Sequence, residues 1–245
     1  MRRRGVLAGA AAMAAAPVRA QVPLRLLSAG ALEPGVAKAL ALWSAQGGTA
    51  VEHSFNTAPR IAERLAAGER FDVLFATVPV IDGLAKDGKL LAPAVPLGSV
   101  GVGIALRAGA PVPPLGDEAG LRAAVEAAGA VVFNRASTGL YMERLFARLG
   151  MAEAVKAKEV RFPDGDAVLR RIASGQGTEI AFAAITEILL FRGKGVHFAG
   201  PLPAAVQNRT AYAAGLLGAG EEARRFVAFM ASGPAKVVMV EAGIE

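Results

Sequence analysis

The sequence predicts an α/β protein in which short strands alternate with amphipathic helices. Apolar residues switch repeatedly between a spacing of two and a spacing of about 3.6, and glycines and prolines separate the segments. No tandem repeat of fixed period occurs. The 245 residues, 53% of them hydrophobic and 20% charged, are enough for one large domain or two smaller ones. Alternation of this kind favours largely parallel sheets covered by helices.

The first part of the chain alternates three strands with three helices. The strands are expected at residues 24–27, 51–55 and 71–76, and the helices at residues 31–45, 58–67 and 79–86. The first helix carries its apolar stripe through Trp43, which we expect in the core.

A long alternating strand at residues 100–106 and a loop with three prolines at residues 109–116 follow. Strands are then expected at residues 130–133, 159–162, 179–183, 196–199 and 209–217. Helices are expected at residues 117–128, 138–149, 221–231 and 234–242, with another after 162 whose N-cap is Asp166.

Two similar blocks, residues 21–97 and 101–200, precede a helical tail that is too small to fold alone. A compact arrangement returns this tail to the first block. We therefore expect one lobe of residues 21–100 plus 205–245, and a second lobe of residues 101–204. The cleft between two such lobes, at the carboxyl ends of strands, is a common ligand site.

The N-terminal residues 1–20 have the pattern of a cleaved export signal. A basic cluster precedes a short run of small apolar residues, and the segment ends in Val18-Arg19-Ala20. Paired arginines favour the twin-arginine route, and the general secretory route is the alternative. We expect cleavage near Ala20 and a periplasmic protein. The remaining chain has 23 basic and 21 acidic residues, so nucleic-acid binding is not expected.

The composition also restricts the chemistry. The absence of cysteine excludes disulfides, thiolate metal sites and cysteine nucleophiles, and two histidines make a histidine-rich metal site improbable. Neither a nucleophile elbow nor a phosphate-binding loop is present. We therefore expect no enzyme, no cofactor and no metal, with a secreted α/β enzyme as the rival class. His53 and His197 lie in predicted strands, as packed or surface residues.

Four predicted strand-to-helix turns are rich in hydroxyl, amide and small residues. They are residues 28–31, 56–59, 136–139 and 164–167. The first N–H groups of a helix are unpaired and carry partial positive charge, so such ends bind anions without a basic side chain. The alternative is that each turn is an ordinary helix cap.

The order and spacing of several motifs resemble periplasmic molybdate-binding proteins of ABC transporters. The resemblance begins at Leu26-Leu27-Ser28-Ala29-Gly30-Ala31-Leu32 and continues through Phe55-Asn56-Thr57-Ala58 and Phe71-Asp72-Val73-Leu74. Gly139-Leu140-Tyr141, Leu149-Gly150 and the tail at residues 226–243 extend it over nearly the whole chain after residue 20. The resemblance implies a type II periplasmic binding protein fold, with two α/β lobes that close over a ligand at a hinge.

In that family, neutral donors hold a tetrahedral oxyanion. Carried over by position, the resemblance implies a ligand site that includes Ser28, Gly30, Ala31, Asn56, Thr57, Ser137, Thr138, Asp166 and Ala167. The chain departs from the family where a serine is replaced by Gly30 or Ala31, and where no tyrosine stands near Ala183-Ala184. A small organic carboxylate or another solute is therefore the alternative ligand.

Three charged residues near the turns have competing interpretations. Arg60 lies in the first turn of its helix, and Arg135 precedes the third polar turn with a fork suited to a carboxylate or phosphate. The alternative for both is a surface arginine or an inter-lobe ion pair. Glu187 is a gate, a ligand for a cationic group, or a helix-start carboxylate.

Together these observations predict an extracytoplasmic solute-binding protein that captures a small anion of the molybdate or tungstate type. The expected partner is an ABC transporter permease in the inner membrane, and the protein is expected to be a monomer.

Overall fold

The computed structural model describes residues 22–175 and 177–245. The expected export signal at residues 1–20 lies outside this part of the chain. Within the described residues, no helix is both long and apolar enough to cross a lipid bilayer.

Strands and helices alternate along the described chain as the sequence predicts. The strands are β1 (Leu24–Ala29), β2 (Val51–Asn56), β3 (Val73–Thr77), β4 (Val95–Arg107), β5 (Ala130–Asn134), β6 (Glu159–Phe162), β7 (Glu179–Ala184), β8 (Val196–Pro201) and β9 (Arg209–Leu216). The helices are α1 (Glu33–Ala45), α2 (Ala58–Ala66), α3 (Val78–Lys86), α4 (Glu118–Ala127), α5 (Ser137–Arg148), α6 (Ala152–Lys156), α7 (Gly165–Ser174), α8 (Ile185–Leu190), α9 (Glu221–Met230) and α10 (Gly233–Glu241), with short 3-10 turns η1 (Gly30–Leu32) and η2 (Ala204–Val206).

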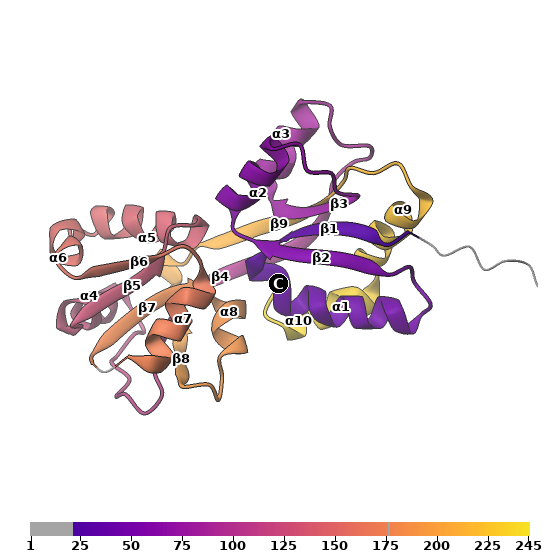
Figure 1. Cartoon of the computed structure of the whole chain (residues 1–245). Helices are drawn as coiled ribbons and strands as arrows, with labels where there is room; N and C mark the ends of the chain where they lie inside the picture. Colours follow the sequence, from indigo (N-terminus) through magenta and orange to yellow (C-terminus); the bar gives the residue numbers. More distant parts are fainter. Residues whose placement is uncertain (1–21, 176) are drawn as a thin grey trace, which may run out of the picture.

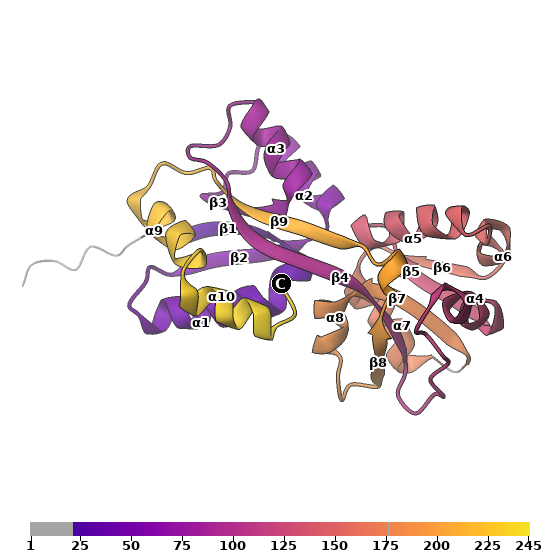
Figure 2. The ribbon, with the colours of Figure 1, turned by 180° about the vertical axis from the view of Figure 1, so that it is seen from behind.

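The strands follow the order β2-β1-β3-β9-β4-β7-β5-β6, and β8 pairs with β4. The pairs β1–β2, β1–β3, β5–β6 and β5–β7 are parallel, as expected for strands joined through helices. β4 and β9 pair antiparallel with each other and with their other neighbours, so the sheet is mixed at its centre. Figures 1 and 2 show these two strands running side by side between two groups of helices and strands.

Separate apolar cores lie on either side of this connection. One core combines β1, β3 and α1 with the C-terminal helices, and there Trp43 packs against Phe226 with ring centroids 5.4 Å apart. The other side holds two clusters drawn from residues 102–206, in which Phe146 packs against Phe182. The lobe boundaries after residues 100 and 204 stay a prediction, which this separation of cores supports.

Local sequence signals explain where several helices begin and end. The Asp117 carboxylate caps α4 by accepting a hydrogen bond from Gly120 N at 2.8 Å. Gly47 and Gly68 have φ angles of 75° and 78° just beyond α1 and α2, a conformation that favours glycine. The expected N-cap at Asp166 was wrong, because the Asp164 side chain accepts from Ala167 N at 2.9 Å and α7 begins at Gly165.

Trp43 is buried as expected, and its indole N–H donates to the Thr49 carbonyl oxygen over 2.8 Å. His53 and His197 are both exposed surface residues, which agrees with the interpretation that gave them no ligand role.

Candidate functional site

The candidate site is a cleft of about 720 Å³ at the carboxyl ends of the parallel strands. The turns after β1, β2, β3, β5, β6 and β7 all contribute to its lining, and Tyr212 enters from β9. Ligands of open α/β sheets bind in this position, since the helix N-termini that follow the strands point toward it. Segments from both cores therefore meet at one cavity.

Most of the residues expected at the site line this cleft. The lining includes Gly30, Ala31, Asn56, Thr57, Ser137, Thr138, Asp166 and Arg60. Three expected residues are not among the lining residues. Ser28 is fully buried and its hydroxyl donates to the Ala29 carbonyl at 3.2 Å, Arg135 is exposed, and Ala167 N is bound by the α7 cap.

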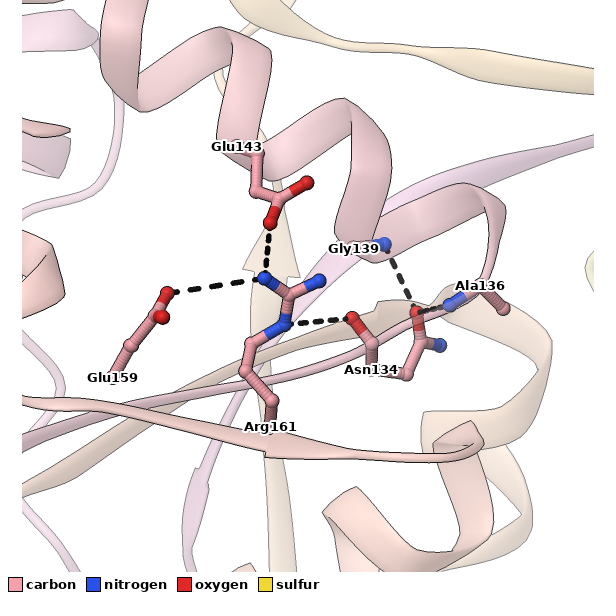
Figure 3. A network of polar contacts seen from close by, with 6 residues as sticks. All are labelled: Asn134, Ala136, Gly139, Glu143, Glu159 and Arg161. Atoms are coloured by element: carbon pink, nitrogen blue, oxygen red, sulfur yellow. Dashed lines mark hydrogen bonds and ion pairs between the residues drawn. The ribbon is translucent and has the colours of Figure 1, made fainter.

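The turn between β5 and α5 is fixed by a buried amide side chain. Asn134 Oδ1 accepts hydrogen bonds from Ala136 N at 3.0 Å and Gly139 N at 2.9 Å (Figure 3). Across the described chain, neither Ser137 N nor Thr138 N has a recorded acceptor. These two N–H groups are at the start of a 12-residue helix that borders the cleft, so they are available to an anion.

Gly139 is required at this turn by the close approach of β5. A methyl group at Gly139 would lie 1.7 Å from the Asn134 carbonyl oxygen, which is far inside van der Waals contact. The sequence motif Gly139-Leu140-Tyr141 thus has a physical role: it lets α5 start directly against the strand. Tyr141 ties the same helix to the return segment, since its hydroxyl donates to the Val206 carbonyl at 2.6 Å.

An ion-pair network centred on β6 supports the same turn. Arg161 on β6 donates from Nε to the Asn134 carbonyl at 3.2 Å and pairs with Glu143 and Glu159 (Figure 3). Its guanidinium lies over the Phe133 ring, 4.4 Å from the centroid. The Arg161 side chain is only 13% exposed, so these contacts hold it in one place and help to fix the strand end that carries Asn134.

The first turn of α7 meets a carboxyl group from α8. A methyl group at Gly165 would lie 2.0 Å from Glu187 Oε2, so the carboxyl group packs directly against this glycine. A methyl group at Gly30 would lie 3.8 Å from Oε1 of the same side chain. The Glu187 carboxyl therefore packs against the α7 turn and lies close to the turn after β1.

The cleft raises the pKa of Glu187 to about 7, chiefly because burial disfavours the charged form. The nearby carboxylates of Asp164, Glu33 and Asp166 act in the same direction, and a hydrogen bond from the Ala184 backbone opposes them. Glu187 is the third residue of α8 and Ala184 is its N-cap, so this bond is half of a capping box. The helix-start interpretation of Glu187 and a cleft role are compatible.

Tyr212 is a cleft residue that sequence analysis missed. The resemblance placed the family's tyrosine near residues 183–184, whereas the structure brings this phenol in from β9 on the opposite side of β4. Burial and the negative charge of Glu187 raise its pKa, and a hydrogen bond with Ser137 lowers it. Only the pairing of β9 with β4 and β3 places Tyr212 here, and no local motif indicates it.

Three cationic side chains line the cleft, and two are already paired. Arg170 binds the Asp166 carboxylate at 2.6 Å, and Arg60 binds Glu63 at 2.9 Å. Lys194 has its ammonium group 5.7 Å from the Phe191 ring centroid. All three cations are exposed, so they lie at the rim of the cleft rather than at its base.

A hydrogen bond also ties α8 to the turn that follows β1. The Thr186 hydroxyl of α8 donates to the Ala31 carbonyl of η1 at 2.7 Å. Thr186 is fully buried, so this bond is shielded from water. It holds α8, and with it Glu187, against the turn that follows β1.

A second cavity of about 650 Å³ lies away from the polar turns. Its lining is mostly apolar and comes from β4, the proline-rich loop, α4 and β7. None of the expected site residues lines it. Over the described ranges 22–175 and 177–245, no cluster of three or more His, Asp or Glu residues is placed to hold a metal ion.

Comparison with known proteins relates this chain to solute-binding proteins. A sequence model of the family described as bacterial extracellular solute-binding protein matches residues 24–245. The chain is 26% identical over 195 residues to an aconitate isomerase from a Pseudomonas species, covering 78% of this chain and 73% of that protein.

Two solved structures show the same fold. The periplasmic molybdate-binding protein of Azotobacter vinelandii aligns with a TM-score of 0.73 at 18% identity, over 91% of this chain and 98% of that one. The sulfate-binding protein SubI of Mycobacterium tuberculosis aligns with a TM-score of 0.72 at 18% identity, over 91% and 86%. The expected periplasmic binding protein fold is therefore confirmed.

Proposed function

Because the chain belongs to the bacterial extracellular solute-binding protein family, whose members work outside the cytoplasm, we propose that it captures a small organic carboxylate in the cleft. The observation that carries this proposal is the α5 turn, where Ser137 and Thr138 present unpaired N–H groups to the cavity. Donors of this kind bind an anion without a buried counter-charge, which is costly to desolvate.

Several features favour a carboxylate over a tetrahedral oxyanion such as molybdate. The serine that the family uses after its first strand is replaced by Gly30 or Ala31, so one neutral donor is missing. An acidic side chain, Glu187, lies in the cleft, whereas the oxyanion site implied by the resemblance consists of neutral donors. A relative at 26% identity is named for a reaction of an organic acid.

The remaining parts of the proposal come from the sequence pattern and from the family. Residues 1–20 direct the chain to the periplasm by the twin-arginine or the general secretory route and are removed near Ala20. The protein is a monomer that binds its ligand without converting it chemically. In its closed form it docks on an ABC transporter permease in the inner membrane. No cofactor is needed.

The proposal is tested by thermal melting of the purified protein against molybdate, tungstate, sulfate, phosphate, succinate, fumarate and trans-aconitate. A ligand at a hundred times its dissociation constant stabilises the fold by about 2.7 kcal/mol. We expect a shift with at least one carboxylate. Ser137→Ala or Thr57→Ala should weaken its binding by about 1–3 kcal/mol, the range for removing one partner of a buried polar group. A shift with molybdate and tungstate alone would restore the oxyanion assignment.

A second candidate is isomerisation of an unsaturated carboxylate. It is favoured by the Pseudomonas relative and by Glu187, whose pKa of about 7 suits a group that moves protons at neutral pH. Incubation with trans-aconitate, followed by proton NMR, measures whether the cis isomer forms. Formation that is lost in Glu187→Gln would establish an enzyme, and no conversion while the ligand binds would leave a binding protein.

A further inference from the structure

We propose that Glu187 selects the ligand by donating a hydrogen bond from its protonated carboxyl group to a carboxylate oxygen of the bound anion. The protein would then capture its ligand together with one proton. This inference rests on the proposed function, because it names the group in the cleft that recognises the carboxylate. No covalent bond forms or breaks, and the proton comes from solvent whenever the free protein holds Glu187 ionised.

The position of Glu187 supports this role. Its side chain lines the cleft, packs against the first turn of α7 at Gly165 and lies close to the turn after β1 at Gly30. The buried Thr186 hydrogen bond to Ala31 fixes the neighbouring residue, so the start of α8 cannot move away from these turns without breaking it. The α5 turn lines the same cleft, and Tyr212 links the two places, since it forms a hydrogen bond with Ser137 and interacts with Glu187.

The groups that face Glu187 disfavour its ionised form. Asp164 and Asp166 approach from the α7 turn and Glu33 from the start of α1, and all three raise its pKa. Tyr212 faces it from β9, and its own pKa is raised in part by Glu187. Within residues 22–175 and 177–245, the opposing contribution comes from the Ala184 backbone hydrogen bond.

Basic residues of the cleft do not counter this effect. The rim cations Arg60 and Arg170 are paired with other carboxylates, and Lys194 lies by the Phe191 ring. The remaining charged residues on elements packed against α8 do not line the cleft; they are Lys38, Arg107, Arg171, Glu179 and His197.

The two protonation states of Glu187 treat an anionic ligand in opposite ways. An ionised Glu187 places a like charge next to the ligand carboxylate, which disfavours binding. A protonated Glu187 supplies an O–H donor, and an O–H···O⁻ hydrogen bond is among the stronger kinds in proteins. A cationic ligand would show the reverse preference. The direction of the pH dependence therefore distinguishes the two ligand classes.

The test is isothermal titration calorimetry with malonate, succinate, fumarate and trans-aconitate at pH 6 and pH 8. With a pKa of about 7, the protonated fraction of Glu187 falls about tenfold over this range, and the affinity of the best of the four should fall by the same factor. At pH 8, titrations in buffers of different ionisation enthalpy should show uptake of about one proton on binding. Glu187→Gln keeps a hydrogen-bond donor but does not titrate, so it should bind with little pH dependence and no proton uptake.

Glu33→Gln is the matched control, because it removes one acidic side chain from the same cleft and leaves Glu187 in place. Its affinity should still fall as pH rises, with the change moved toward lower pH, because the Glu33 carboxylate contributes to the raised pKa of Glu187. An equal pH dependence in the unmodified protein and Glu187→Gln, or an affinity that rises with pH, would overturn the inference while leaving carboxylate binding intact. If none of the four carboxylates bound to either protein at either pH, the proposed function and the inference would both be overturned.

Discussion

Replacement of Asn134 by alanine should loosen the β5–α5 turn and destabilise the fold. The side chain is 4% exposed, and its Oδ1 accepts hydrogen bonds from Ala136 N and Gly139 N at 3.0 and 2.9 Å. Each such bond contributes about 1 kcal/mol net, and a buried donor left without a partner costs about 1–3 kcal/mol. We expect Asn134→Ala to lower the free energy of unfolding by about 3 kcal/mol. For a chain of this size, that is a melting temperature roughly 6–12 °C lower.

The assay is urea denaturation of the unliganded protein, followed by circular dichroism and by the fluorescence of Trp43. Asn134→Asp is the matched variant, since it retains the oxygen that accepts both hydrogen bonds and places negative charge at a helix N-terminus, where it is favourable. We expect it to destabilise the fold less than Asn134→Ala does, while its negative charge weakens anion binding. A free energy of unfolding of Asn134→Ala within about 0.5 kcal/mol of the unmodified protein, equivalent to about 1–2 °C in melting temperature, would refute the reasoning.

Three further predictions concern the same cleft. Gly139→Ala should lower the free energy of unfolding by about 1–3 kcal/mol or more, because its methyl group would lie 1.7 Å from a β5 carbonyl oxygen. The control Gly83→Ala on α3, where the space around the glycine is open, should be neutral or stabilising in chemical denaturation. Glu187→Gln should stabilise the protein by up to about 3 kcal/mol at pH 8 and not at pH 4. The reason is that the pKa of Glu187 is higher in the folded than in the unfolded protein, so its ionisation removes stability as pH rises from about 4.5 to 7. Equal effects at both pH values would contradict this prediction. Thr186→Val should remove the hydrogen bond to Ala31 and lower the free energy of unfolding by about 1 kcal/mol. Amide hydrogen exchange at the start of α1 and α8 should become faster than in the unmodified protein. Unchanged exchange there would mean that the bond does not hold the two segments together.

The alternation of strands and helices was predictable from the sequence because apolar periodicity and helix caps are local signals. Trp43 fell in the core as its helical stripe indicated, and the long strand was recognised from the alternation that starts at Val100. Its true start at Val95 was missed, since Pro96 and Gly98 interrupt the pattern. Those residues coincide with an irregularity in the β4–β9 pairing. The antiparallel pairing of β9 depends on contacts distant in sequence, which periodicity does not encode.

The site was predictable where it consists of turns and not where it depends on tertiary placement. The lining residues Asn56, Thr57, Ser137 and Thr138 lie at the end of a strand or within four residues after it, which is a local feature. Tyr212 could not be found in this way, because it reaches the cleft from a strand that joins the sheet between β3 and β4.

The roles of two further residues, Ser28 and Asn134, depend on the direction of their side chains, which the sequence pattern does not give. Ser28 was expected in the lining, but its side chain is fully buried. Asn134 has an internal role that only its two hydrogen bonds reveal.

The central claim is that a carboxylate binds at the free N–H groups of the α5 turn. Its most direct test is a titration of the ¹⁵N-labelled protein, followed by amide resonances, with the carboxylate that stabilises the fold most. The account predicts large shifts at Ser137 and Thr138 and smaller ones at Ala136 and Gly139, whose N–H groups stay bound to Asn134. Shifts confined to residues of the second cavity, around α4 and the proline-rich loop, would contradict it.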